Sequence, residues 1–124
     1  MGDRLRAVRG ATTVEKNEKE AILDASAELL QALTEKNGLT VGDLAAVIFT
    51  VTPDLTAAFP AEAARVRLGW HAVPLLCVQE AAVQGALPFC VRVLLLAEFP
   101  AERQPAPVYL RQAISLRPDW AEKE

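Results

Sequence analysis

The run L-A-A-V-I-F-T-V-T at residues 44–52 constrains the fold of this chain more than any other segment. It is continuous, apolar and rich in β-branched residues, and it has the length of a single strand. Such a run is typical of a strand that is buried on both faces. The chain is therefore expected to build its core on a sheet, and Pro53 and Asp54 are expected to turn the backbone at the end of this strand.

Three further strands are predicted from shorter patterns. Residues 4–14 are rich in β-branched residues and predict a first strand. The segment V-P-L-L-C-V at 73–78 predicts a third strand, which Pro74 confines to a sheet edge or to a strand start. The segment F-C-V-R-V-L-L-L-A at 89–97 predicts a fourth strand after a turn.

Two helices are expected between these strands. Asn17 and Glu20 have the spacing of a capping box, and Asn37 with Gly38 is typical of a helix end. Apolar residues recur between them at helical spacing: Ile22, Leu23, Leu29, Leu30 and Leu33. A second helix of about two turns is expected to begin at Pro60, since proline suits the first helical position.

The end of the chain is expected to lack regular structure. Prolines 100, 105 and 107 interrupt it, and the tail from residue 118 is polar and is expected to be mobile. No linker, repeat or shift of composition divides residues 1–124, so the prediction is one domain with the order β-α-β-α-β-β.

Composition and charge exclude several classes of function. Acidic residues outnumber basic ones by 16 to 13, whereas a nucleic-acid-binding protein usually presents a basic face. No apolar run approaches the roughly 20 residues that span a bilayer, so a cytoplasmic protein is expected. Cys77 and Cys90 form no C-x-x-C pair, which fits a reducing compartment and argues against zinc. A chain of 124 residues builds a modest core, and a deep cleft would call for a second subunit.

Familiar catalytic motifs are absent from the sequence. It contains no G-x-S-x-G, no G-x-G-x-x-G after a strand, no G-x-x-x-x-G-K-[ST] and no H-x-x-x-H. Hydrolase, dinucleotide-binding and nucleotide-binding functions are therefore not favoured.

Arg92 is the strongest candidate for a functional residue, because it is the one charge in the apolar stretch 87–96. An arginine left unpaired in such a strand would cost several kcal/mol. Two interpretations are equally supported. Either Arg92 forms a buried salt bridge, for example with Glu80, or its forked guanidinium faces a cavity and binds an anion.

The other candidate residues have ordinary structural interpretations when each is taken alone. A solvated strand arginine is favoured for Arg9, and an exposed helical arginine is favoured for Arg65. Glu80 is expected to neutralise an arginine, and Tyr109 to pack as an aromatic. Arg117, just before Pro118, carries no information alone.

The order of short motifs resembles the monofunctional chorismate mutases of the small trimeric α/β class, as distinct from the all-helical class. The resemblance covers nearly the whole chain. It rests on V-R-G-A-T-T-V-E at 8–15, T-P-D-L at 52–55, F-P-A at 59–61, V-P-L-L-C-V-Q-E at 73–80, V-R-V at 91–93, V-Y-L at 108–110 and L-R-P-D at 116–119.

The resemblance implies a fold and a reaction. The fold is α+β with a mixed, ferredoxin-like sheet, and three chains form a pseudo-α/β-barrel homotrimer with active sites between subunits. The reaction is the Claisen rearrangement of chorismate to prephenate, towards phenylalanine and tyrosine. It uses no cofactor, no metal and no covalent intermediate, and it works by selecting the reactive conformer and stabilising charge on the breaking ether.

The resemblance also implies roles for individual residues. Arg92 would donate to the ether oxygen and to a carboxylate, and Arg9 and Tyr109 would hold carboxylates. Glu80 and Cys77 would receive the ring hydroxyl.

The remaining implied residues shape the cleft. Phe59 and Ala61 would form an apolar wall, Arg65 a polar contact at the mouth, and Leu116 with Arg117 a mobile covering tail.

The sequence departs from the family pattern at two places. Glu62 replaces a lysine that some members carry after F-P-A, so this position supplies no cation at the cleft edge. The segment 104–110 lacks the usual arginine and histidine before Tyr109.

Two alternatives from other classes stay open at this point. One is an imine or enamine deaminase on a similar trimer, which would have no reason to retain V-Y-L and L-R-P-D. The other is a non-catalytic module that binds an aromatic-pathway metabolite. The joint presence of Arg9, Glu80, Arg92 and Tyr109 speaks against the second.

Overall fold

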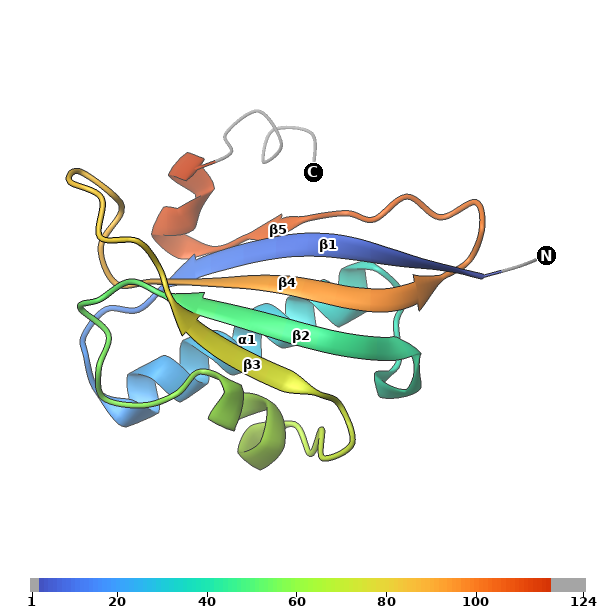
Figure 1. Cartoon of the computed structure of the whole chain (residues 1–124), viewed down its shortest axis with the longest axis horizontal. Coiled ribbons are helices and arrows are strands. Elements are labelled where there is room, and N and C mark those ends of the chain that lie inside the picture. Colours follow the sequence, from blue (N-terminus) through green and yellow to red (C-terminus); the bar gives the residue numbers. More distant parts are fainter. Residues whose placement is uncertain (1–2, 117–124) are drawn as a thin grey trace.

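A five-stranded mixed sheet covered on one face by a long helix forms the molecule, as the computed structural model describes it for residues 3–116 (Figure 1). The strands are β1 (Arg4–Thr13), β2 (Leu44–Val51), β3 (Leu75–Gln79), β4 (Cys90–Phe99) and β5 (Val108–Tyr109). The helix α1 spans Lys19–Lys36, and three short helical segments are η1 (Val41–Asp43), η2 (Ala63–Arg67) and η3 (Arg111–Leu116). None of the helices in residues 3–116 is long and apolar enough to cross a membrane.

The sheet order is β3-β2-β4-β1-β5. The central strand β4 runs antiparallel to both β1 and β2, while β3 and β5 lie at the edges, each parallel to its neighbour. All four predicted strands are confirmed, and β3 lies at a sheet edge as Pro74 indicates.

The core lies between α1 and the sheet. Leu29, Leu30 and Leu33 of the helix are fully buried, as is Leu95 of the central strand. A Cβ atom at Gly10 would lie 2.8 Å from Cδ1 of Leu33, so glycine at this point of β1 lets the helix approach the strand closely. The spacing of apolar residues that predicted the helix therefore also determines which of its faces packs on the sheet.

The helix α1 leaves the opposite face of the sheet, called the outer face below, uncovered. Val47 and Phe49 of β2 are completely buried under α1, but Ile48 and Thr50, which point the other way, are only partly buried. The expectation that this strand is buried on both faces is therefore wrong for the single chain, because one helix covers only one side. Several large apolar side chains of the outer face are exposed: Leu5, Leu76, Val78 and Leu94.

The expected capping box at the start of α1 is also wrong. The residue before the helix is Glu18, which makes no side-chain capping hydrogen bond. The Asn17 side chain instead accepts hydrogen bonds from the backbone N–H groups of Thr56 and Ala57, both at 3.0 Å. The Asn17 side chain therefore binds a loop that is distant in the sequence and does not cap the helix.

The segment after Pro100 contains regular structure that was not predicted. β5 pairs with β1, and η3 follows it directly. The second helix is present as a short turn over 61–67 whose last part is π-helical. The expected mobile tail from 118 lies outside the described residues.

Candidate active site

Arg92 lies on the outer face, near the start of β4. Its Nε is 3.1 Å from Oε2 of Glu80, and the Thr50 hydroxyl donates a hydrogen bond to the same carboxylate oxygen. The Arg92 side chain is 47% exposed, whereas that of Glu80 is 18% exposed. The predicted ion pair is thus present, but it is not buried, and the guanidinium is accessible to a further anion.

Four of the predicted site residues share this outer face. Ala11 is the register partner of Arg92 on one side and of Tyr109 on the other, so Arg92 and Tyr109 flank a small side chain. Arg9 precedes Ala11 by two positions and is exposed on the same face. Together with Glu80, these residues form what we call the arginine face: Arg9, Glu80, Arg92 and Tyr109.

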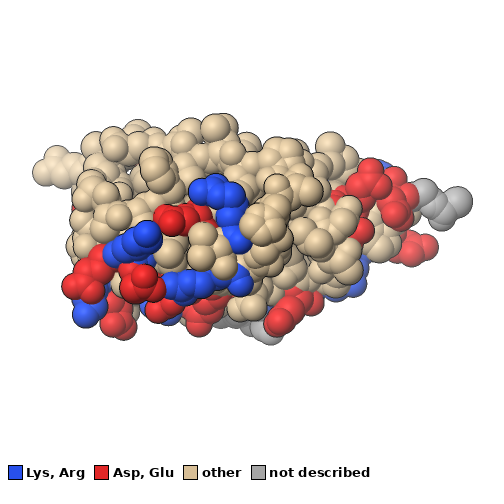
Figure 2. Space-filling view, turned by 90° about the horizontal axis from the view of Figure 1, so that it is seen from below, with Lys and Arg blue, Asp and Glu red and all other residues tan. Residues whose placement is uncertain are grey.

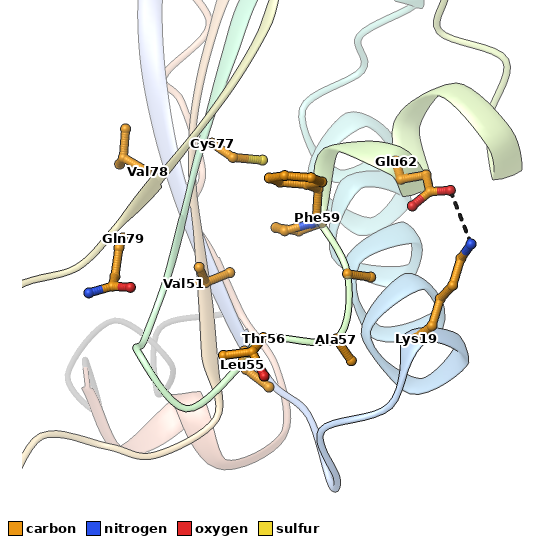
Figure 3. Close-up of a pocket in the computed structure, with 12 residues that line it drawn as sticks. Lys19, Val51, Leu55, Thr56, Ala57, Phe59, Glu62, Cys77, Val78 and Gln79 are labelled. Atoms are coloured by element: carbon orange, nitrogen blue, oxygen red, sulfur yellow. Dashed lines mark ion pairs between the residues drawn. The ribbon is translucent and has the colours of Figure 1, made fainter.

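A second group surrounds a pocket on the helix side of the edge strand β3. The pocket has a volume of about 520 Å³ and lies between β3 and the loop 55–60 (Figure 3). Its walls are mostly apolar and include Val51, Leu55, Phe59 and Cys77. The side chains of Phe59 and Cys77 point toward each other in Figure 3, and Phe59 is 70% exposed. We call this cavity the β3 pocket.

The Cys77 thiol lies near two further predicted site residues, Ala61 and Arg65, which are not among the residues that line the β3 pocket. Burial raises its pKa, while a hydrogen bond with the backbone of Ala61 and the charge of Arg65 oppose this effect. Cys77 therefore stays a neutral thiol near neutral pH, which suits a hydrogen bond with a hydroxyl group.

The arginine face and the β3 pocket lie on opposite faces of the sheet. Cys77 pairs with Phe49, which is buried under α1, while the next residue, Val78, pairs with Thr50 beside Arg92. One chain therefore presents two separate half-sites and does not bring the predicted residues into a single cleft.

The last two predicted site residues are near the end of the described chain. Leu116 is the final residue of η3 and is half-buried. η3 is attached to the end of β1, because the backbone N–H of Gln112 donates to Oγ1 of Thr13 at 3.2 Å. Arg117 lies outside the described residues.

Sequence reasoning missed two residues that shape these half-sites. Thr50 holds the Glu80 carboxylate, and Asn17 fixes the loop that leads to Phe59. Thr50 could have been found from the sequence, because it is a polar residue within the apolar run 44–52. The role of Asn17 could not be predicted from the neighbouring sequence, because its partners are about forty positions away in the chain.

Comparison with known proteins supplies the family. The model of the family described as chorismate mutase type I matches residues 5–120. The chain belongs to this family. The predictions of a chorismate mutase of the small α/β class, and hence of an isomerase, are confirmed.

Individual relatives agree along most of their length. The chain is 53% identical to the chorismate mutase AroH of Thermus thermophilus over 93% of this chain and 95% of that protein. It is 40% identical to chorismate mutase AroH of Bacillus subtilis (strain 168), over 93% of this chain and 91% of that protein. Among solved structures, a chorismate mutase from Clostridium thermocellum superposes with a TM-score of 0.83 at 42% identity, covering 89% of this chain and 98% of that one. The predicted α+β fold with a mixed sheet is thereby confirmed.

Proposed function

We propose that the chain rearranges chorismate to prephenate in clefts formed between two copies, where the β3 pocket of one copy meets the arginine face of the next. The observation that carries this proposal is the separation of the half-sites on opposite faces of one sheet edge. Neither half alone holds both the apolar wall and the arginines that the reaction needs, whereas two copies placed edge to face would supply both.

A homotrimer is the assembly that we propose for these clefts. The outer face exposes Leu76 at 57% and Val78 at 42%, beside the half-exposed Arg92. Covering such apolar surface contributes roughly 25 cal/mol for each Å² removed from water. A contact between two different surfaces of the same chain closes into a ring when the rotation permits, so three equal clefts would result.

Arg92 is the residue that we assign to the chemical step. Negative charge develops on the ether oxygen as the C–O bond breaks, and a cation already held in place stabilises that charge without reorganisation. Glu80 holds the Arg92 guanidinium through Nε. Arg9 and Tyr109 on the same face would hold carboxylates of the folded conformer.

The β3 pocket would hold the ring and its hydroxyl. Phe59 lines the pocket, and we assign it and the nearby Ala61 to the apolar wall. The neutral thiol of Cys77, together with Glu80 of the neighbouring copy, would form hydrogen bonds with the hydroxyl. Arg65 would contribute at the mouth. No group has to change its protonation state during the reaction, because bonds form and break within one molecule.

The place of the reaction follows from its product. We assign the step to aromatic amino acid biosynthesis in the cytoplasm, where the free thiols Cys77 and Cys90 remain reduced. The comparisons give no support to an imine deaminase or to a non-catalytic binding module.

The test is the loss of chorismate, followed by ultraviolet absorbance, with the parent and with Arg92→Ala and Arg92→Lys. We expect rapid loss with the parent and a fall in kcat of about 10²–10³ in Arg92→Ala. Lysine should rescue poorly, because an ammonium cannot donate in parallel to Glu80 and to the ether oxygen in the way that a guanidinium fork can.

Two other outcomes would contradict this proposal. A folded parent without activity would overturn the reaction, and full rescue by lysine would overturn the role of the fork. Circular dichroism of each variant shows that it is folded. Because Arg92 is 47% exposed, neither substitution is expected to disturb the fold.

A further inference from the structure

Two charged side chains lie at the rim of the β3 pocket. Among the described residues that line it, Lys19 and Glu62 are the charged ones. Lys19 is the first residue of α1, and Glu62 lies just before η2. Nζ of Lys19 is 3.4 Å from Oε2 of Glu62, and Figure 3 shows the pair reaching across from the two elements.

We propose that Lys19 is a substrate-binding residue, which draws a substrate carboxylate to the mouth of the β3 pocket and holds it there. Glu62 keeps the ammonium at the rim in the free protein. This inference rests on the proposed function, since the substrate is a dicarboxylate. Glu62 stands where some family members carry a lysine, and Lys19 of α1 would supply a cation at the cleft edge instead.

The pair is not needed to attach η2 to α1. Arg67 of η2 already forms ion pairs with Glu20 and Asp24 of the helix, each at 2.5 Å. Charged side chains of both signs gather over this helical part of the surface in Figure 2. The attachment of η2 to α1 therefore does not require the ion pair of Lys19 with Glu62.

The electrostatics of the rim favour a role in binding. The Lys19 side chain is 56% exposed and free to move toward a ligand, while that of Glu62 is only 28% exposed. Without Lys19, the Glu62 carboxylate would stand uncompensated beside an apolar pocket and repel a dianion. Lysine reaches an arriving carboxylate as a flexible point charge, which suits capture better than the fixed geometry required at the reacting bond.

The experiment compares Lys19→Gln, Glu62→Gln and the double variant with the parent in steady-state kinetics at low and high salt. Lys16→Gln is the matched control, because Lys16 pairs with Glu18 at 3.7 Å near the start of the same helix and does not line the pocket. Calorimetric titration with chorismate runs beside the kinetics.

We expect Lys19→Gln to raise KM about 3–10-fold with kcat changed less than about twofold, the pattern of a lost binding contact. The double variant should recover part of the loss, because it also removes the repelling carboxylate. The increase in KM should be smaller near 1 M salt, where the Debye length is about 3 Å and charges are screened. Lys16→Gln should match the parent. Melting temperatures should be unchanged, since exposed ion pairs contribute little.

Other outcomes would overturn the inference, the proposed reaction, or both. Equal KM and equal calorimetric affinity in Lys19→Gln and Lys16→Gln would exclude Lys19 from binding, even with an active parent. A fall in kcat alone would show a different role. A parent that binds chorismate without turnover would refute the proposed reaction, while the Lys19 result would still be read from the affinities. A parent that does not bind chorismate would overturn both.

Discussion

Arg92 shows that the same residue can carry a structural contact and remain available for a ligand. The ion pair with Glu80 uses Nε, and half of the side chain is still accessible on the outer face. The sequence left two interpretations of this arginine equal, a buried salt bridge or an anion site. The structure shows the ion pair, which is not buried because α1 leaves the outer face uncovered, while the anion site stays a prediction.

Cys90 provides a prediction at the scale of one residue. The thiol is fully buried, and burial raises its pKa, while the charge of Arg92 opposes that shift. A raised folded pKa means that the thiol contributes stability below the ordinary thiol pKa, and that this contribution is lost as pH rises through the folded value.

Urea unfolding between about pH 8 and pH 10 checks this prediction. The free energy of unfolding of the parent should fall with pH more steeply than that of Cys90→Ala, whatever the difference at neutral pH. Parallel curves for the two proteins would show that Cys90 titrates equally in the folded and unfolded states.

One buried side chain at the end of α1 holds the segment that precedes β5. Asn37 is completely buried at the end of α1 and forms hydrogen bonds with the carbonyl oxygen of Leu33 and with both backbone groups of Ala106. These bonds fix the segment that leads into β5, where Tyr109 lies three positions later. The sequence predicted a helix end at Asn37 but no β5, because this contact joins residues 69 positions apart.

Asn37→Ala should therefore lower the free energy of unfolding by about 2–3 kcal/mol, since it removes three hydrogen bonds and leaves buried backbone groups unpaired. KM for chorismate should rise as well, through the loss of a defined position for Tyr109. The measurements are urea unfolding and steady-state kinetics. Thr34→Ala is the control from the preceding turn, since the Thr34 hydroxyl bonds only to carbonyl groups of its own helix and should contribute much less. Equal losses in the two variants would refute the bridging role.

The whole molecule is organised by the contrast between the two faces of its sheet. One face is buried by α1, and the other presents exposed apolar residues around the arginine face. The proposed trimer predicts that two inactive variants can restore activity when they are mixed. Some clefts of the mixed trimers would take the intact arginine face from one variant and the intact β3 pocket from the other.

Arg92→Ala and Phe59→Asp should each be nearly inactive alone. Phe59 is 70% exposed, so its replacement should leave the fold intact. When equal amounts are unfolded and refolded together, about one quarter of the clefts should combine an intact arginine face with an intact β3 pocket. Chorismate loss should recover to about that fraction of the parent activity. A mixture of Arg92→Ala with Arg9→Ala is the control and should recover nothing. Absence of recovery in the first mixture, with mixed trimers present, would refute a shared cleft.

The sequence by itself determined four of the five strands and the long helix, because patterns of apolar residues act locally. Its short motifs indicated the family, and the site residues that the family implies stay a prediction. The tertiary structure decided what depends on contacts between distant segments. It paired Asn17 with the loop at 56–57, built β5 beside β1 and separated Cys77 from Arg92 by the thickness of the sheet. The physical reason is that a strand pattern specifies which residues alternate, whereas only the placement of α1 decides which face is covered and which stays open to a second chain.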